Sequence, residues 1–318
     1  MKRYKSIEIC AGAGGQALGL EEAGFEHVAL VEVEQVACST LRINRPTWNV
    51  VHQNVKDFSA KEYVGVDLFA GGVPCPPFSV AGKQLGAMDE RDLFPEAIRL
   101  VSECMPKAIM LENVKGLLDK KFESYRIDII SQLEKLGYSC SWQLVHASDF
   151  GVSQLRPRAV LVALKNEYFH FFRWPEKSDP PPPVGELLFE EMASLGWETV
   201  HEWKKNASSI APTLVGGSKK HGGADLGPTR AREAWAKLGV DGRGLADAPP
   251  KNGSKVMPKL TLQMAALVQG FPKTWVFAGK KTPAYRQVGN AFPPPVAKAI
   301  GSAIIKAIKK YEKSNNIV

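Results

Sequence analysis

The residue whose type and setting best suit covalent chemistry is Cys75, in the segment Gly71-Gly-Val-Pro-Cys-Pro-Pro-Phe-Ser79 that follows an apolar run. A cysteine near a strand is more often buried filler than a reagent. Cys75, however, stands among glycines and prolines and precedes a polar stretch, residues 81–91, long enough to close over a substrate. A loop thiol ionises more readily than a core thiol, so Cys75 is our candidate nucleophile.

A glycine-rich turn near the N-terminus is the second chemical signal. Ile9-Cys-Ala-Gly-Ala-Gly-Gly15 follows the first apolar run and opens a helical pattern, where glycines let a cofactor approach the backbone. The second apolar run reaches Glu32, and a carboxylate there can bind both hydroxyls of a ribose. Turn and acid together predict a cofactor that contains adenosine, with NAD, FAD and S-adenosylmethionine all open at this point.

Strands alternating with helices are the elements that must position these groups. Short apolar runs predict buried strands at residues 7–10, 28–33, 66–70, 108–111 and 159–164. Helical patterns fill gaps between them at residues 16–23, 94–104 and 124–136. This order predicts an α/β fold with a mostly parallel sheet that binds its ligands at the carboxyl ends of the strands.

The pattern breaks at four consecutive prolines within residues 178–184, which can join neither a helix nor the interior of a sheet. Residues 184–258 are irregular and rich in Gly, Lys, Pro and Trp, with a short helical stretch at 229–238. Near the end, residues 296–311 form an amphipathic helical pattern behind three prolines. We expect that helix to pack back on the first domain.

Charge is distributed unevenly along the chain. Residues 1–200 hold 21 Lys and Arg against 27 Asp and Glu, whereas residues 201–318 hold 20 against 6. Such asymmetry suggests that a polyanion docks on the C-terminal third, although charge alone is equally compatible with a solvated basic face.

Composition also excludes several classes. No apolar stretch is long enough for a membrane span, and no signal-peptide core follows the first residues, so we expect a soluble cytoplasmic chain. The five cysteines and six histidines show no metal-ligand spacing and no CxxC pair, so neither a metal site nor a disulfide is expected.

Four short motifs make a family resemblance specific. They are Pro74-Cys75, Glu112-Asn113-Val114, Gln154-x-Arg156-x-Arg158 and Gln287-Val-Gly289-Asn290, in the order seen in DNA (cytosine-5)-methyltransferases. Over its whole length the chain resembles the compact bacterial or phage enzymes of restriction-modification systems. The resemblance implies methyl transfer from S-adenosylmethionine to C5 of a cytosine flipped out of a short specific sequence in double-stranded DNA.

The same resemblance implies two domains. Residues 1–180 and 285–318 are expected to form a Rossmann-like, S-adenosylmethionine-binding α/β domain that carries the chemistry. Residues 181–284 are expected to form a second, smaller and irregular target-recognition domain. The implied protein is a monomer in a prokaryotic cell or encoded by a phage, with a restriction endonuclease of the same site as a partner that the resemblance allows.

Four side chains are assigned catalytic roles on this resemblance. Cytosine C5 is too weak a nucleophile to attack a sulfonium methyl group, so a thiolate, Cys75, must first add to C6. Glu112 would then donate to the N3 side of the ring and read the exocyclic amine. Arg158, with Arg156 in support, would stabilise charge near O2 and help to keep the thiol ionised.

The resemblance also implies two sets of contacts. The cofactor contacts are Cys10, Ala11, Gly12, Ala13, Gly14, Gly15, Glu32, Val33, Asn54, Val55, Gly72, Pro74, Asn290 and Ala291. The DNA contacts are Ser79, Gln84, Arg91, Thr213, Lys219, Lys220, His221, Arg230 and Arg232. Cys10 stands where the family usually has an aromatic residue, and Asn54 where it has an aspartate, so we expect the adenine contacts to be rearranged.

Other functions compete with this interpretation. A transfer RNA cytosine-5 methyltransferase shares the motifs, and a basic insert of residues 184–258 favours duplex DNA instead. A catalytically inactive DNA-binding homologue would not need Cys75, Glu112 and Arg158 together. An amine methyltransferase would carry a polar residue in place of Cys75, and an oxidoreductase would leave the later motifs without a purpose.

Overall fold

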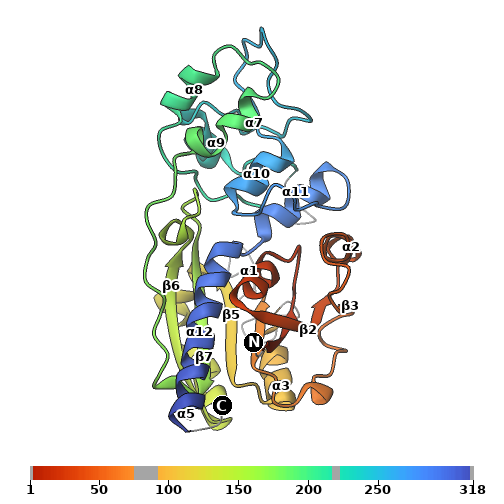
Figure 1. Cartoon of the computed structure of the whole chain (residues 1–318), viewed down its shortest axis with the longest axis vertical. Coiled ribbons are helices and arrows are strands. Elements are labelled where there is room, and N and C mark those ends of the chain that lie inside the picture. Colours follow the sequence, from red (N-terminus) through yellow and green to blue (C-terminus); the bar gives the residue numbers. More distant parts are fainter. Residues whose placement is uncertain (1–2, 75–91, 217–222, 316–318) are drawn as a thin grey trace.

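The computed structural model describes residues 3–74, 92–216 and 223–315, and in them a seven-stranded sheet forms the lower part of the molecule (Figure 1). The strands are β1 (Tyr4–Ile9), β2 (Phe25–Glu32), β3 (Val50–His52), β4 (Leu68–Gly72), β5 (Ala108–Val114), β6 (Tyr138–His146) and β7 (Pro157–Lys165). Their order is β3-β2-β1-β4-β5-β7-β6, and only β7 runs antiparallel to its neighbours β5 and β6. The predicted α/β class and mostly parallel sheet are therefore confirmed.

The chain direction in this sheet creates a place for a ligand. From β1 the chain moves outward to β2 and β3, and it then returns to add β4 and β5 on the other side of β1. The helices that follow β1 and β4 consequently diverge to opposite faces. A crevice forms at the carboxyl ends of these two strands, as expected at such a switch point.

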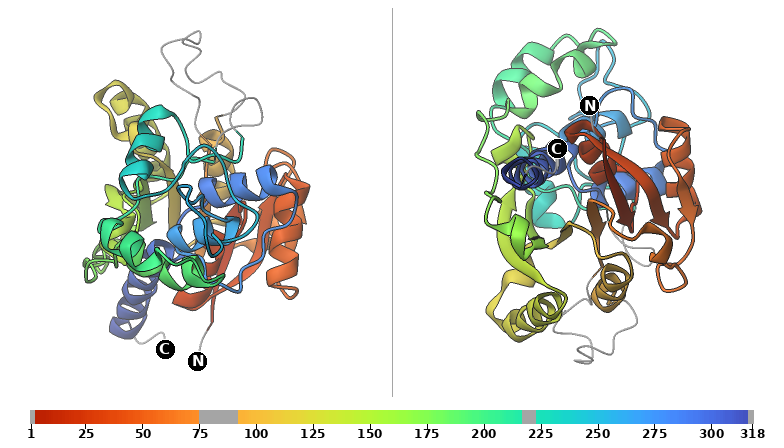
Figure 2. Two further views of the ribbon diagram at one scale, coloured as in Figure 1. Left: turned by 90° about the horizontal axis from the view of Figure 1, so that it is seen from above. Right: turned by 60° about the horizontal axis from the view of Figure 1, so that its bottom comes forward.

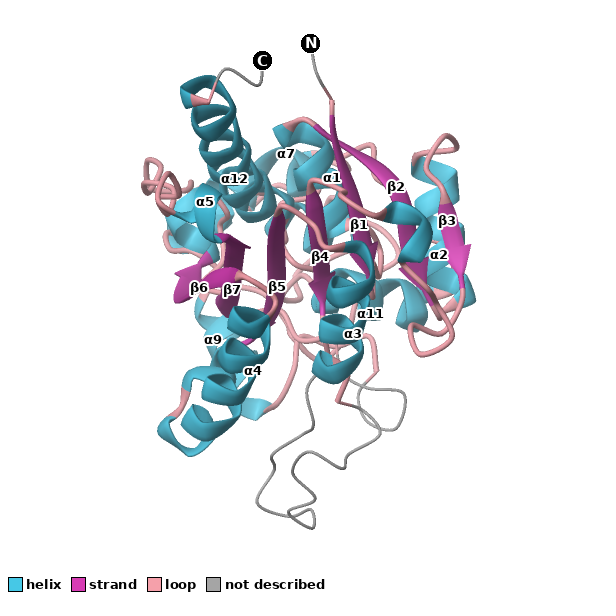
Figure 3. Cartoon of the chain, turned by 90° about the horizontal axis from the view of Figure 1, so that it is seen from below, coloured by secondary structure: helices cyan, strands magenta, loops and turns pink. Residues whose placement is uncertain are grey.

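Helices cover both faces of the sheet (Figures 2 and 3). The helices around the sheet are α1 (Gly15–Ala23), α2 (Gln35–Asn44), α3 (Phe94–Cys104), α4 (Glu123–Lys135), α5 (Asn166–Phe169) and α12 (Pro294–Ser314). Short 3-10 turns occur at Lys61–Tyr63, Lys115–Leu118, Lys120–Phe122 and Ala147–Phe150. Apolar side chains of α3 and α4 form one core with the sheet, and those of α12 form another on the opposite face.

The C-terminal helix α12 packs on the sheet domain as predicted. It begins at Pro294, whose missing N–H costs nothing in the first helical turn. Ile300, Ile304 and Ile308 recur at helical spacing and are fully buried against β4, β5 and β7. The last segment of the chain thus returns to the domain formed by the first.

The upper part of the molecule contains five short helices joined by long loops (Figure 1). They are α6 (Val184–Leu187), α7 (Phe189–Ala193), α8 (Val200–Asn206), α9 (Thr229–Lys237) and α10 (Leu262–Val268), and α11 (Lys281–Asn290) leads back to the sheet. One apolar core joins Trp203, Trp235 and Leu260 of this part with Leu18 and Leu41 near the sheet. The predicted boundary at residue 285 lies within α11, and the division into two domains stays a prediction.

Candidate active site

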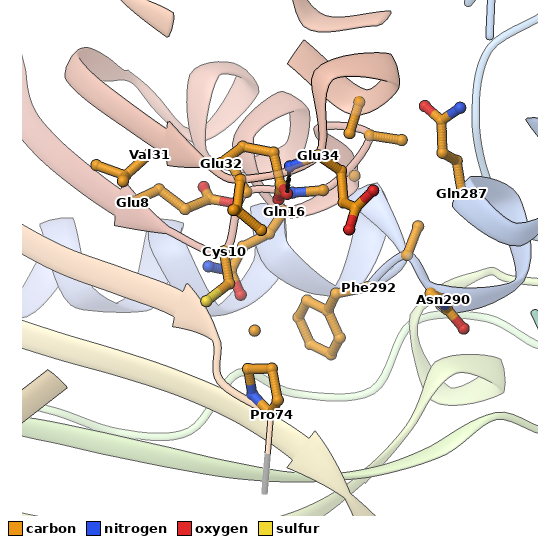
Figure 4. A pocket seen from close by; sticks show the side chains of 18 of the residues that line it. Glu8, Cys10, Gln16, Val31, Glu32, Glu34, Pro74, Gln287, Asn290 and Phe292 are labelled. Atoms are coloured by element: carbon orange, nitrogen blue, oxygen red, sulfur yellow. Dashed lines mark hydrogen bonds between the residues drawn. The ribbon is translucent and has the colours of Figure 1, made fainter. Parts of the chain in front are cut away.

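A cavity of about 530 Å³ opens at the carboxyl ends of β1, β2 and β4, at the switch point of the sheet (Figure 4). Its size lies within the range of small-molecule sites. All of the predicted cofactor contacts except Gly14 line it, and so does Glu112. Gly14 instead caps the N-terminus of α1. The roles of these residues as cofactor contacts stay predictions.

The Glu32 side chain ties the glycine turn to the end of β2. Its Oε2 accepts a hydrogen bond from the backbone N–H of Gly12, and its Oε1 accepts one from that of Glu34, both at 2.7 Å. Burial raises the pKa of the Glu32 carboxyl group, and these backbone donors oppose the rise. Each carboxylate oxygen keeps a second acceptor position that a hydroxyl can use.

The backbone of the turn is held in an uncommon conformation. Gly12 has φ of 55°, and Cys10 has φ of 52°, a left-handed conformation that a residue with a Cβ atom rarely adopts. Strain of this kind, of the order of 1 kcal/mol, gathers at ligand sites. It brings Cys10 to the wall of the cavity.

Cys10 is nevertheless a poor nucleophile. Burial, together with the charges of Glu32 and Glu8, raises the pKa of its thiol to about 12. Burial likewise raises the pKa of the other cysteines in the described part of the chain, namely Cys38, Cys104 and Cys140. None of these four thiols is ionised near neutral pH. Cys75, the predicted nucleophile, lies outside the described residues.

Glu112 and Arg158 form an ion pair beside the cavity. Arg158 Nε lies 2.7 Å from Glu112 Oε1, and the two side chains are only 13% and 11% exposed. The antiparallel register of β5 and β7 pairs Val114 with Arg158 and so brings both side chains to the same edge. The two predicted catalytic groups therefore meet in the structure.

The segment that contains Cys75 is anchored at both ends. The Asn113 amide Nδ2 donates to the carbonyl oxygen of Val73 at 2.7 Å, directly beside Glu112. The Leu93 N–H donates to the carbonyl oxygen of Pro74 at 3.3 Å, and Pro74 and Leu93 both line the cavity. The residues that flank the segment on either side thus meet at the cavity. Ser79, Gln84 and Arg91 lie outside the described residues.

Arg156 has contacts unlike those of Arg158. Its guanidinium is fully buried and donates to the carbonyl oxygens of Leu214 and Gly289, both at 2.9 Å. Burial and the nearby Arg158 lower the pKa of Arg156 well below its usual value. Because these contacts lie between the recognition region and α11, they correct the predicted catalytic role: Arg156 is a positioning residue.

The same joint contains a close contact between two glycines. A Cβ atom at Gly216 would collide with the side chain of Asn290, and one at Gly289 would collide with the backbone of Gly216. Gln154 secures the joint from the other side, because its Oε1 accepts from the Leu214 N–H at 2.8 Å. The recognition region therefore lies directly against the helix that carries the cavity residue Asn290.

The predicted DNA contacts are only partly visible. Thr213 is half-buried next to the joint, and Arg230 on α9 is exposed. Arg232 donates from Nε to the carbonyl oxygen of Gly227 at 2.7 Å, a contact within its own region. The remaining candidates lie outside the described residues; they are Lys219, Lys220 and His221.

Several lining residues carry no signal in the sequence. They are Glu8, Gln16, Val31, Glu34, Val36, Ala37, Gln53, Leu93, Pro283, Arg286, Gln287 and Phe292. Glu8 and Gln16 are the most informative, because both are polar and buried at the cavity wall. A glutamate inside a strand reveals its chemistry only when burial is known.

Two classes of site are not seen in the described residues. No group of His, Cys, Asp and Glu there is arranged to hold a metal ion. Among the helices of residues 3–74, 92–216 and 223–315, none is both long and apolar enough to cross a membrane.

Comparison with known sequences identifies relatives over the whole chain. The profile of the family described as C-5 cytosine-specific DNA methylase matches residues 4–306. The Type II methyltransferase M.NgoMIV of Neisseria gonorrhoeae is 58% identical over 312 residues, which cover 97% of this chain and 99% of the relative. The Type II methyltransferase M.NaeI of Lentzea aerocolonigenes is 56% identical over 97% of this chain and 76% of its own.

Solved structures are similar in fold. A protein of an Escherichia coli prophage, described as a DNA modification methyltransferase, superposes with a TM-score of 0.68 at 22% identity, over 96% of this chain and 99% of its own. The DNMT2 of Spodoptera frugiperda gives a TM-score of 0.66 at 19% identity, over 96% and 99%. At such identities the similarity concerns the fold alone.

Proposed function

The chain belongs to the C-5 cytosine-specific DNA methylase family, and on this premise we propose how its cavity and ion pair methylate a cytosine in duplex DNA. The enzyme is a DNA (cytosine-5)-methyltransferase. Its proposed biological role is that of the modification enzyme of a restriction-modification system. The similarity to two Type II methyltransferases supports that role.

We assign the cavity to S-adenosylmethionine, which supplies the methyl group. Three features support the fit. Glu32 offers carboxylate oxygens to the ribose hydroxyls, and Val33, 55% exposed, offers an apolar surface to the adenine. Asn290 lies at the opposite side of the cavity, where its amide can bind a polar end of the ligand (Figure 4).

Cys75 is proposed to form the covalent bond to the target base. Its sulfur adds to C6 of cytosine, the electron pair moves onto C5, and C5 then takes the methyl group. Loss of the C5 proton breaks the sulfur–C6 bond and restores the ring. The raised pKa values of the four described cysteines support Cys75 as the nucleophile.

Glu112 and Arg158 are proposed to hold the ring while charge develops on it. A carboxyl group at N3 donates a hydrogen bond to the ring, and a guanidinium near O2 stabilises its negative charge. The 2.7 Å contact between the two side chains supports a shared role, because each fixes the orientation of the other. Arg158 thereby selects one rotamer of Glu112 before the base arrives.

The recognition region is proposed to bind double-stranded DNA and to present one flipped cytosine. Removing a base from the stack costs a few kcal/mol, which contacts in the pocket must repay. The excess of 20 basic over 6 acidic residues in residues 201–318 supports binding to phosphates. The specific sequence is read by contacts to base edges in the grooves.

The observation that carries this proposal is the meeting of Glu112, Arg158 and the anchored Pro74 at one cavity. Its test is bisulfite sequencing of the genome of a host without cytosine methylation, expressing either the wild type or Cys75→Ser. We expect protected cytosines confined to one short sequence, absent in the variant. Protection that persists in Cys75→Ser would refute the nucleophile, and no protection in the wild type would refute the DNA substrate.

A further inference from the structure

Two polar side chains at the cavity wall lack the partners that buried groups require. Glu8 on β1 is 1% exposed, and Gln16 in the first turn of α1 is 4% exposed. Within the described residues, Glu8 Oε2 and both amide atoms of Gln16 have no hydrogen-bond partner of acceptable geometry. Both side chains line the cavity, and Figure 4 shows them near Cys10.

Unpartnered groups of this kind are costly. A buried polar atom without a hydrogen bond destabilises the fold by about 1–3 kcal/mol, and a carboxylate by more. Three such atoms gathered at one wall of a ligand cavity are therefore a binding surface that its ligand completes. The ligand must bring a cation or donor for Glu8 and both a donor and an acceptor for Gln16.

We propose that Glu8 and Gln16 bind the amino-acid end of the cofactor, with the ammonium group between Glu8 Oε2 and Gln16 Oε1 and the carboxylate accepting from Gln16 Nε2. This proposal rests on the assignment of the cavity to S-adenosylmethionine. It matches the inventory of unpartnered atoms, because an α-amino acid carries a three-donor cation beside an acceptor anion. Glu32 is left to the ribose.

The charge around Glu8 supports this assignment. Burial raises the pKa of its carboxyl group well above the ordinary value, and Gln16 offsets part of the rise. The nearby charge of Glu32 raises it further. A cation is the ligand group that relieves both the burial and the repulsion. The positive N-terminus of α1, which begins at Gly15, favours the carboxylate on the side of Gln16.

The test compares two ligands that differ only beyond the sulfur. S-adenosyl-L-homocysteine carries the amino-acid end, whereas 5′-methylthioadenosine shares the adenosine and sulfur and lacks it. The affinities of both ligands are measured by calorimetry for the wild type, Gln16→Leu and Glu8→Gln. Gln53→Leu is the matched control, because Gln53 also lines the cavity but donates to its own loop, at the carbonyl oxygen of Asp57.

We expect Gln16→Leu and Glu8→Gln each to lose about tenfold or more in affinity for S-adenosyl-L-homocysteine, and less than about twofold for 5′-methylthioadenosine. The control Gln53→Leu should change both affinities by the same factor. Equal losses for both ligands in Gln16→Leu, or no loss, would overturn the inference. If the wild type binds neither ligand, the assignment of the cavity itself fails, which is a separate outcome.

Discussion

The ion pair of Glu112 and Arg158 provides the most demanding test of the proposed chemistry. Its charged atoms lie 2.7 Å apart, and both side chains are nearly nine-tenths shielded from water. Removing one partner of such a pair costs about 3–5 kcal/mol, because the other charge stays buried and unpaired. If about 3 kcal/mol of this falls on the transition state, the methyl-transfer rate drops about 10²-fold.

The expected outcome is a double-mutant cycle with strong coupling. Glu112→Gln and Arg158→Met should each slow single-turnover methyl transfer about 10²-fold or more, since each removes one group and disorients the other. The double variant should be about as slow as the slower single variant, because the two residues act as one unit. Rates are measured by transfer of a labelled methyl group to DNA that contains the recognition sequence.

A second buried ion pair separates chemistry from stability. Lys107 contacts Asp67 at 2.7 Å and Glu312 at 3.1 Å, away from the residues that line the cavity. Lys107→Met should therefore lower the melting temperature without changing the single-turnover rate. Losses that multiply in the double variant, to about 10⁴-fold or more, would refute the shared role of Glu112 and Arg158. An equally slow Lys107→Met variant would refute it too.

Three further outcomes follow from the structure. Arg156→Met leaves the carbonyl oxygens of Leu214 and Gly289 without donors, at about 1–3 kcal/mol each, so amide hydrogens around both residues should exchange faster by mass spectrometry; unchanged exchange would contradict the positioning role. The pKa of Glu8 is raised in the folded state, so stability is lost as the pH rises from the ordinary carboxyl value through the folded value. Without cofactor, Glu8→Gln should thus melt at a higher temperature than the wild type at pH 8 and at a similar one near pH 4, and an equal difference at both pH values would argue against this linkage. At pH 7.5, iodoacetamide should modify Cys75 rapidly and spare the four described cysteines, whose pKa values are raised; peptide mass spectrometry that finds another cysteine modified first would exclude this order of reactivity.

The sequence predicted the strands that are buried on both faces and missed those that are not. The strands β1, β2, β4, β5 and β7 are near-continuous apolar runs, as strands covered by helices on both faces must be. By contrast, β6 lies at an edge and half of it is polar, so its sequence has no such run. The three residues of β3 are too few for any pattern.

At the site, motifs located the cavity but could not distribute roles within it. The glycine turn and Glu32 follow strands directly, so their meeting at one edge of the sheet was predictable. Arg156 and Arg158 are two residues apart and alike in type, and only their partners separate a positioning role from a place in the ion pair. Glu8 resembled a surface charge until its burial was known.

The contact between Gly216 and Gly289 has a consequence for engineering the specificity of the enzyme. Because neither position has room for a side chain, a recognition segment transplanted from a relative must keep a glycine where it meets α11. The core that Trp203 and Trp235 share with Leu18 adds a second seam to be matched. The recognition region is thus no interchangeable cassette, and new sequence preferences are better sought by varying its exposed loops than by exchanging it whole.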